Sequence, residues 1–266
     1  MRAYVRLRER PMLPTVLAGL AAAGYETIEG DPRTIVPGDV LVTWNRSARE
    51  EPIAQRVEAE GGTVLVMENG YFGETEQRLG FRHYALARGE HNGAGEWEVG
   101  EGSRLEAFGI QLKPWRDGGK YVLVCPSRGI GSTKMRMPPD WLQSTLAKLK
   151  AISKLPVLVR GHPGNWRRKG MGRWLLDDLQ KAAAVVIWAS SVGVQALMEG
   201  VPVIYTAPRW IAEGACTNDL ERVNRPHFGT RLPVFERLMW AHWTKQELES
   251  GYPFRLICRR EERAAA

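Results

Sequence analysis

The stretch VVIWASSVGVQALMEGVPVIY, from Val185 to Tyr205, restricts the possible folds more than any other part of the chain. An apolar run suited to a buried parallel strand leads into two serines and a glycine, and apolar residues at helical spacing follow. A glycine and a proline then end the helix before a second apolar run begins. This order of strand, turn, helix and strand predicts an α/β fold with a parallel sheet.

The start of the predicted helix is suited to binding an anion. Ser190 or Ser191 can cap the helix, and Gly193 would let a ligand approach the backbone. Unpaired N–H groups and the positive end of the helix dipole attract negative charge. An ordinary capped helix in an α/β sheet has the same residues, so this stretch alone does not separate the two interpretations.

Strands and helices alternate along most of the chain, as expected for βαβ units. In the first half the pattern predicts strands over 4–8, 25–29, 39–43, 63–67 and 81–87, and helices over 12–23, 48–60 and 103–109. In the second half it predicts strands over 121–125, 156–160, 185–188 and 202–205, and helices over 141–150, 174–181, 233–243 and 244–251. The segment 111–119 has the proline, glycines and charges of a linker. We therefore expect two Rossmann-like domains, residues 1–117 and 118–266, with a frayed tail from Arg259 onward.

Polar groups follow three successive strands of the second domain. They are Ser127, Arg128 and Gly129 after the first strand, Arg160 and His162 after the second, and Ser190 and Ser191 after the third. The carboxyl ends of parallel strands lie at one edge of a sheet, so these groups converge if the strands are neighbours. Asp177 and Asp178 lie in a helical pattern, and we expect them on the solvated surface. The first loop lacks the GK[ST] ending of a P-loop and the GxGxxG pattern, which argues against an NTPase and a dinucleotide-dependent oxidoreductase.

Two strand ends of the first domain supply candidate proton acceptors. Glu68 follows the strand over 63–67, and His91 lies in the glycine-rich loop after the strand over 81–87. Polar turns after apolar strands are where open α/β sheets hold their ligand groups. In the alternative interpretation Glu68 only shapes a turn and His91 is a surface loop residue.

The charge is divided unevenly along the chain. The formal net charge is +7, made up of about −4 in residues 1–117 and +11 in residues 118–266. A basic second half fits a ligand that carries phosphate, a nucleic acid, or a solvated basic face without a partner. The three cysteines are widely spaced, which argues against disulfides and structural zinc, and no apolar run reaches membrane-spanning length. We expect a cytoplasmic protein.

Several residues fit contacts with a nucleic acid. A basic loop with Trp166 and Trp174 at its ends can grip phosphates and stack on bases; its cationic residues include Arg167, Arg168 and Lys169. On the first domain, an aromatic pocket would hold an extruded base, and Trp44 and Tyr71 can help to form it. We also expect acceptor or DNA contacts from Asn45, Arg46, Asn69 and Asn92. In the alternative interpretation the tryptophans belong to the core and the basic loop is a solvated corner.

A His-Pro pair after one strand, then Ser-Ser-x-Gly at the start of a helix that ends in Glu-Gly-Val-Pro, is similar to the nucleotide-sugar half of GT-B glycosyltransferases. Over residues 120–205 the chain most resembles the branch that includes bacterial sialyltransferases and capsule Kdo transferases. The resemblance implies a GT-B-like α/β fold with two facing Rossmann-like domains and C-terminal helices that cross back to the first. It also implies that His162, Ser190 and Ser191 contact the donor phosphate and that Glu199 lies near the ribose.

The segments WNR, ENGY, ARGEHNGAGEW, SRGIG, HPG, ASSVG and LPVFERLMWAHWTKQEL together resemble short glycosyltransferase-like proteins of tailed phages. Such proteins are associated with sugar modification of hydroxymethylated pyrimidines in phage DNA, within the host cytoplasm. The resemblance implies a glycosyltransferase that modifies hydroxymethyluracil or hydroxymethylcytosine in DNA. The chain is shorter than ordinary GT-B enzymes and lacks the carboxylate motif of sialyltransferases, so the resemblance does not fix the proton acceptor.

Glycosyl transfer from a nucleotide sugar requires stabilisation of the leaving phosphate and deprotonation of the attacking hydroxyl. Arg128, Arg160 and the serine hydroxyls can stabilise the phosphate without a metal, and the sequence contains no DxD motif. Glu68 or His91 would accept the proton. We therefore expect a metal-independent enzyme whose only co-substrate is a nucleotide sugar. A surface glycan or small acceptor is the alternative to DNA, and a non-catalytic nucleotide- or DNA-binding protein is the alternative to an enzyme.

Overall fold

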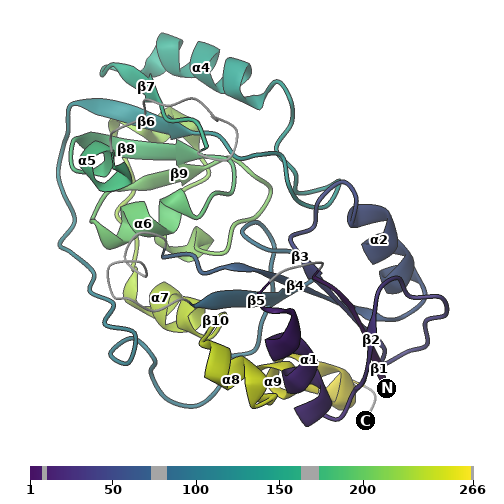
Figure 1. Cartoon of the computed structure of the whole chain (residues 1–266). Helices are drawn as coiled ribbons and strands as arrows, with labels where there is room; N and C mark the ends of the chain where they lie inside the picture. Colours follow the sequence, from purple (N-terminus) through teal and green to yellow (C-terminus); the bar gives the residue numbers. More distant parts are fainter. Residues whose placement is uncertain (8–10, 73–82, 163–173, 265–266) are drawn as a thin grey trace. The chain divides into compact units, whose positions relative to one another are not determined.

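A computed structural model describes residues 1–7, 11–72, 83–162 and 174–264, with side chains up to Cys258. It divides into two compact units (Figure 1). The first unit consists of Met1–Gly102, Gly131–Lys134 and Met239–Ala266, and the second of Ser103–Ile130 and Met135–Leu238. The division differs from the predicted boundary at residue 117, because residues 103–117 belong to the second unit and the last residues to the first.

The first unit is built on a six-stranded sheet with the order β10-β5-β4-β3-β1-β2. Its strands are β1 (Arg2–Arg6), β2 (Glu26–Glu29), β3 (Val40–Trp44), β4 (Thr63–Asn69), β5 (Tyr84–Arg88) and β10 (His242–Trp243). Strands β1 to β4 pair in parallel, whereas β5 runs antiparallel to β4 and β10. The central strands are apolar on both faces, as expected for a parallel sheet covered on both sides.

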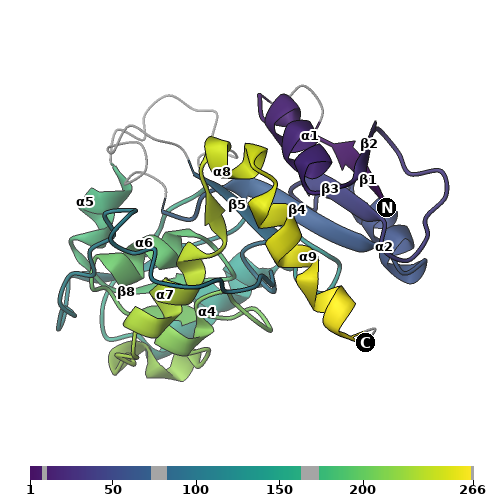
Figure 2. The ribbon, with the colours of Figure 1, turned by 90° about the horizontal axis from the view of Figure 1, so that it is seen from below.

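Helices cover both faces of this sheet. They are α1 (Leu13–Ala22), α2 (Glu51–Ala59), α8 (Lys245–Glu249) and α9 (Tyr252–Ala264). On one face, Ala54 and Val57 of α2 pack in a cluster with Val64 and Val66 of β4. The other helices pack together, because Gly19 of α1 lies directly against the α8 backbone and α9 contacts both α1 and β5 (Figure 2).

The end of the chain confirms the prediction that the terminal helices return to the first domain. Two details differ from the sequence prediction. The helix expected over 233–243 ends at Met239, because His242 and Trp243 pair with Ala85 and Tyr84 to form an edge strand. The expected frayed tail is instead the last part of α9, which continues to Ala264. None of the described helices is both long enough and apolar enough to cross a membrane.

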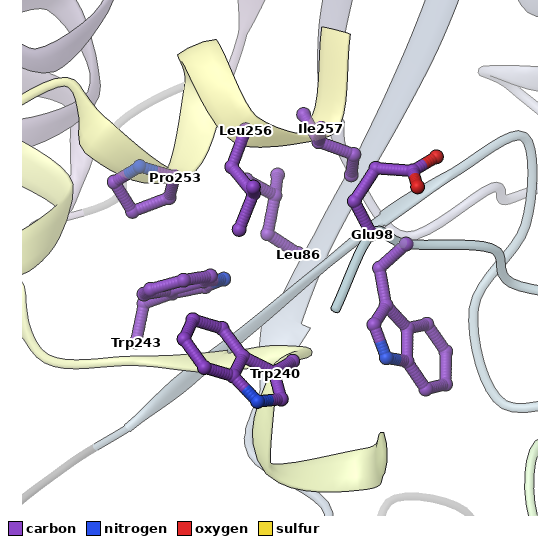
Figure 3. Close-up of a pocket in the computed structure, with 8 residues that line it drawn as sticks. Leu86, Glu98, Trp240, Trp243, Pro253, Leu256 and Ile257 are labelled. Atoms are coloured by element: carbon purple, nitrogen blue, oxygen red, sulfur yellow. The ribbon is translucent and has the colours of Figure 1, made fainter. Parts of the chain in front are cut away.

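Three tryptophans of the first unit belong to its core. Trp97, Trp240 and Trp243 are 7%, 5% and 2% exposed, and they line a small apolar pocket together with residues of β5 and α9 (Figure 3). The pocket has no room for a water molecule. These indoles therefore stabilise the packing of the last helices on the sheet and are not placed to stack on a base.

The second unit contains a four-stranded parallel sheet with the order β7-β6-β8-β9. Its strands are β6 (Tyr121–Cys125), β7 (Val157–Val159), β8 (Ala182–Ile187) and β9 (Val203–Tyr205). Its helices are α4 (Trp141–Ile152), α5 (Leu175–Leu179), α6 (Val192–Met198) and α7 (Leu232–Met239), with short 3₁₀ turns η1 (Glu213–Ala215) and η2 (Leu220–Asn224). Val122 and Val186 of the sheet pack with Trp141 and Leu149 of α4 in its core.

The segment expected to be a linker is fixed to the second unit. Arg231 donates hydrogen bonds to the carbonyls of Leu197 at 2.6 Å and Lys113 at 2.7 Å, and its guanidinium lies 4.0 Å from the centre of the Trp115 ring. Gly200 packs against the same segment, since a Cβ there would lie 2.0 Å from the Pro114 carbonyl oxygen. These contacts explain why the boundary falls before residue 103. Residues 105–109, predicted to be helical, form turns.

Replacing Gly200 with alanine tests this packing. Gly200 and Gly118 both have left-handed backbone conformations, with φ of 75° and 86°, but a Cβ on Gly118 would meet no atom within 4 Å. We expect Gly118→Ala to lower the free energy of unfolding by about 1 kcal/mol through backbone strain. Gly200→Ala adds overpacking and should cost about 3 kcal/mol in all. Urea denaturation of both variants measures the difference, and equal losses would contradict the close packing on Pro114.

Candidate functional site

The three polar loops of the second unit lie at one edge of its sheet. Strand β6 pairs in parallel with β7 on one side and with β8 on the other. The strands are therefore neighbours, as the convergence of their loops requires. Their carboxyl ends lead to the loops that contain Ser127, His162 and Ser190, so this edge is the candidate site of the second unit.

Arg128 and His162 lie close enough to interact electrostatically. The pKa of His162 is lowered, first by partial burial of the imidazole and then by the positive charge of Arg128. Both effects favour the neutral imidazole at pH 7. A bound phosphate would compensate the charge of Arg128, so the pair is suited to an anion.

The loop after β6 adds a hydroxyl and a flexible backbone to this edge. The Ser127 hydroxyl is buried, and it has no hydrogen-bond partner among the residues that the structure describes. A buried polar atom without a partner is costly unless a ligand or a water molecule satisfies it. Gly129 has a φ of 68°, a conformation that favours glycine. Ser127 is thus suited to a donor or acceptor on a ligand.

Arg160 is held by a carboxylate that the sequence prediction placed on the surface. Its Nη1 donates to Asp178 Oδ2 at 2.5 Å, and Asp178 is only 8% exposed. The Tyr121 hydroxyl also donates to the Asp178 carbonyl, at 3.0 Å. The prediction of a solvated Asp178 is therefore wrong, because α5 packs against β8 and turns this carboxylate inward. Asp178 fixes Arg160 at the site edge.

The turn before α6 caps the helix through Ser190, one of the two predicted residues. Ser191 is the N-cap residue but its side chain makes no capping bond; instead, the Ser190 hydroxyl accepts from the Val192 N–H at 3.3 Å. A Cβ on Gly193 would lie 2.6 Å from the Trp210 ring. The absence of a side chain at Gly193 therefore makes room for the Trp210 ring. On the side where this ring lies, the predicted approach of a ligand to the Gly193 backbone is not supported.

Glu199 lies at the C-terminal end of α6, away from Ser190 and Ser191. The seven-residue helix begins beside the carboxyl end of β8, and Glu199 is its C-cap residue. At 1.5 Å per residue the helix carries Glu199 about 12 Å away from Ser191. Its carboxylate also pairs with Lys113 Nζ at 2.5 Å. The predicted ribose contact stays a prediction, and it requires a donor that extends to the C-terminal end of the helix.

At the carboxyl edge of the first unit, four predicted residues end two neighbouring strands. Trp44 ends β3 and lies edge-to-face with Tyr84, at 6.3 Å between ring centres. Asn45 follows with a φ of 62°, the only positive value among the described non-glycine residues. Glu68 and Asn69 are the last residues of β4, which is two residues longer than predicted. Trp44, Asn45 and Asn69 thus remain suited to contacts with an acceptor.

Arg46, which was predicted to contact the acceptor or DNA, instead forms a buried ion-pair network. Its guanidinium donates two hydrogen bonds to Glu58, at 2.7 and 2.8 Å, and one to Glu51 at 2.5 Å. A further bond, at 2.6 Å, goes to the Gly89 carbonyl. Burial lowers the pKa of Arg46, but the bonds to Glu58 and Glu51 outweigh this effect and raise it. The predicted acceptor contact is therefore wrong, since the packing of α2 brings both carboxylates to the arginine.

Tyr71 is likewise a core residue. It is 1% exposed, and its ring lies edge-to-face with His242 at 4.8 Å between centres. The Tyr71 N–H donates to His242 Nε2 at 2.9 Å. The arrival of β10 from the end of the chain buries this tyrosine, so its predicted place in a base pocket is wrong.

His91 is paired with a carboxylate that the sequence analysis did not single out. Its Nδ1 lies 3.1 Å from Glu90 Oε1, and the two residues are 8% and 5% exposed. The pKa of Glu90 is lowered: burial alone would raise it, but the hydrogen bond with His91 and the backbone N–H of Ser132 outweigh burial. His91 is therefore not the surface residue of the alternative interpretation. The sequence signal that could have predicted this pair is the glutamate directly before the histidine.

The loop that contains His91 lies on the same face of the sheet as Glu68. Strand β5 runs antiparallel, so it ends beside Leu65, far from Glu68. The loop then folds back, because a Cβ on Gly95 would lie 3.0 Å from that of Ala87 and 2.8 Å from the His91 carbonyl oxygen. Ala85 is the cross-strand partner of Glu68. Ala87 lies two residues further along β5, at a distance of about 7 Å. The face covered by α2 thus carries both candidate proton acceptors.

Residues 131–134 are fixed to the first unit by hydrogen bonds to Arg46, Glu90 and Glu51. The Gly131 N–H donates to the Arg46 carbonyl at 2.9 Å, the Ser132 N–H to Glu90 Oε2 at 2.8 Å, and the Thr133 N–H to Glu51 Oε1 at 3.2 Å. Asn92, a predicted acceptor residue, has a buried Oδ1 with no hydrogen-bond partner in the described structure. This segment shares its anchoring carboxylates with Arg46 and His91.

Some predicted residues fall outside the description. Arg167, Arg168 and Lys169, with Trp166, lie in the range that the structure does not describe. Trp174, at the other end of the basic loop, is 63% exposed. Within the described ranges, no group of three or more His, Cys, Asp or Glu side chains is arranged to hold a metal ion.

Comparison with solved structures gives matches over nearly the whole chain. One is the β-Kdo 2,7 transferase of KpsC from Thermosulfurimonas dismutans, with 12% identity and a TM-score of 0.53, covering 98% of this chain and 100% of the other. Another is the β-Kdo 2,4 transferase of KpsC from the same organism, with 15% identity, a TM-score of 0.54, and coverage of 90% and 89%. The chain has a GT-B-like α/β fold. No protein-family model and no curated protein sequence matches the chain.

The interaction between Arg128 and His162 can be measured directly. We expect Arg128→Gln to raise the pKa of His162 toward its ordinary value, because a repelling charge is removed, while burial keeps it below that value. NMR titration of the imidazole measures the change. The control is Arg222→Gln, which removes the same charge from an exposed position of η2 in the same unit. An unchanged His162 pKa in Arg128→Gln would show that the two groups do not share a site.

Proposed function

We propose that the protein is a glycosyltransferase that uses a nucleotide sugar as donor. The observation that carries this proposal is the parallel pairing of β6 with both β7 and β8, which places Arg128, His162 and Ser190 at one sheet edge. The GT-B-like fold that the chain shares with two Kdo transferase structures supports it.

The sheet edge at the carboxyl ends of β6, β7 and β8, called the donor edge from here on, is suited to a leaving group that carries phosphate. Arg128 supplies positive charge, Arg160 supplies N–H donors while its own charge is compensated by Asp178, and the hydroxyls of Ser127, Ser190 and Ser191 supply donors for phosphate oxygens. Because α6 has only seven residues, we assign most of the stabilisation to these side chains and less to the helix dipole. His162, which is neutral at pH 7, can donate a hydrogen bond without adding charge. On this basis the reaction needs no metal ion.

The acceptor hydroxyl would lose its proton to a group of the first unit. Glu68 and His91 remain the candidates, and both lie on the sheet face covered by α2. Transfer breaks the bond between the anomeric carbon and the phosphate oxygen and forms a bond from that carbon to the acceptor oxygen. The proton of the hydroxyl passes to the base, and the nucleotide leaves with the electron pair.

For the acceptor, we propose a hydroxymethylated pyrimidine in DNA. The support is the basic second half of the chain, the exposed Trp174 beside the basic loop, and the segments that resemble the phage proteins. The buried positions of Arg46 and Tyr71 leave Trp44, Asn45, Asn69 and Asn92 as the acceptor residues of the first unit. A glycan acceptor, with Kdo as the transferred sugar, is the second candidate, and the structural similarity to the Kdo transferases favours it.

A donor panel with two acceptors tests the proposal. The protein is incubated with UDP-, GDP- and CMP-linked sugars, including CMP-Kdo, and with either hydroxymethylated DNA or a Kdo-terminated glycan; mass analysis of the digested products identifies the transfer. We expect a sugar on the DNA base, with EDTA leaving the rate unchanged. Transfer to the glycan alone would favour the second candidate. If no donor is bound or consumed, the protein is a non-catalytic α/β binding protein and the proposal fails.

The donor edge has its own prediction. Arg128→Ala should weaken binding of the active donor about tenfold or more, since a charge-assisted hydrogen bond to phosphate contributes about 1.5 kcal/mol or more. Isothermal titration calorimetry gives the dissociation constant, and Arg222→Ala is the control for the loss of one positive charge. Equal donor affinity in the two variants would remove Arg128 from the donor site.

A further inference from the structure

We propose that Glu90 is a positioning residue that holds His91 with its hydrogen on Nδ1, so that Nε2 accepts the proton of the acceptor hydroxyl. This inference rests on the proposed glycosyl transfer, and it selects His91 over Glu68 as the base. It starts from the geometry of two adjacent buried side chains, with 3.1 Å between His91 Nδ1 and Glu90 Oε1.

The protonation state of Glu90 decides which imidazole nitrogen carries the hydrogen. The pKa of Glu90 is lowered, because His91 and the Ser132 N–H outweigh the effect of burial, so the carboxylate is ionised at neutral pH. An ionised carboxylate only accepts hydrogen bonds. Nδ1 of His91 must therefore donate, and in the neutral imidazole Nε2 is then the acceptor. A carboxylate that fixes a catalytic imidazole in this way is the arrangement of the serine protease triad.

The surroundings hold the pair in place. Glu90 Oε2 accepts from the Ser132 N–H at 2.8 Å, which leaves Oε1 directed to His91. Arg46 fixes the loop at the Gly89 carbonyl, and its own charge is compensated by Glu51 and Glu58. The charged groups that these contacts place around His91 are thus Glu90, Arg46, Glu51 and Glu58. The side chains of His91 and Glu90 are 10% and 6% exposed. Because Glu90 is the more buried of the two, it acts on the reaction through the His91 imidazole.

Glu90→Gln tests the role of the carboxylate. The amide can donate to Nδ1, which moves the imidazole hydrogen to Nε2 and removes the acceptor. We expect kcat to fall about 100-fold or more, the range in which general bases contribute, with the donor dissociation constant unchanged. Glu98→Gln is the matched control: it removes a carboxylate from the same segment, where Glu98 pairs with Arg88 at 3.0 Å, and should keep the wild-type kcat.

The tautomer of His91 gives a readout that does not depend on turnover. ¹⁵N NMR of the imidazole, without substrate, should show hydrogen on Nδ1 in the wild type and in Glu98→Gln, and on Nε2 in Glu90→Gln. A wild-type His91 with its hydrogen on Nε2 overturns the inference, even if Glu90→Gln does not fold. So does a kcat in Glu90→Gln equal to that of the control. If the wild type transfers no sugar from any donor, the proposed function fails, while the NMR comparison still decides the geometry of the pair.

Discussion

The parallel hydrogen bonding of β6 to two neighbours is the constraint on which the candidate site of the second unit depends. Because β7 and β8 both run in the direction of β6, three loops far apart in sequence leave the sheet at the same edge. No single loop there has the pattern of a complete phosphate site. Arg128, Arg160 and the serines become one electrostatic environment only through the backbone pairing of apolar strands that carry no charge themselves.

In the first unit, carboxylates hold the residues of the candidate site together. Glu51, Glu58 and Glu90 are distributed around Arg46, the His91 imidazole and the N–H groups of residues 132 and 133. Each of the three makes a charge-assisted bond in a partly buried place, where such bonds are strong. The network explains why a loop without regular structure holds a fixed conformation, and why residues that look suited to a ligand in sequence are internal.

The sequence predicted those parts of the fold that depend on apolar runs and turn residues. Strands β3, β6 and β8 and the polar loops at their ends follow from local patterns, since a buried parallel strand is apolar throughout. Periodicity carries no direction, so the antiparallel course of β5 was not predictable. The positions of Tyr71 and Asp178 depend on β10 and α5 packing on them, which no local pattern records. The distance of Glu199 from Ser191 is different, because it follows from the length of α6 alone.

The first unit is assembled from both ends of the chain, and this has a consequence for its biosynthesis. Until residues 239–264 have left the ribosome, strand β5 lacks its β10 partner and Gly19 of α1 is not covered by the α8 backbone. The second unit, which is encoded between these parts, can complete its sheet earlier. During synthesis the nascent first unit therefore exposes an open sheet edge and an apolar surface, the condition in which aggregation competes with folding and chaperones are needed.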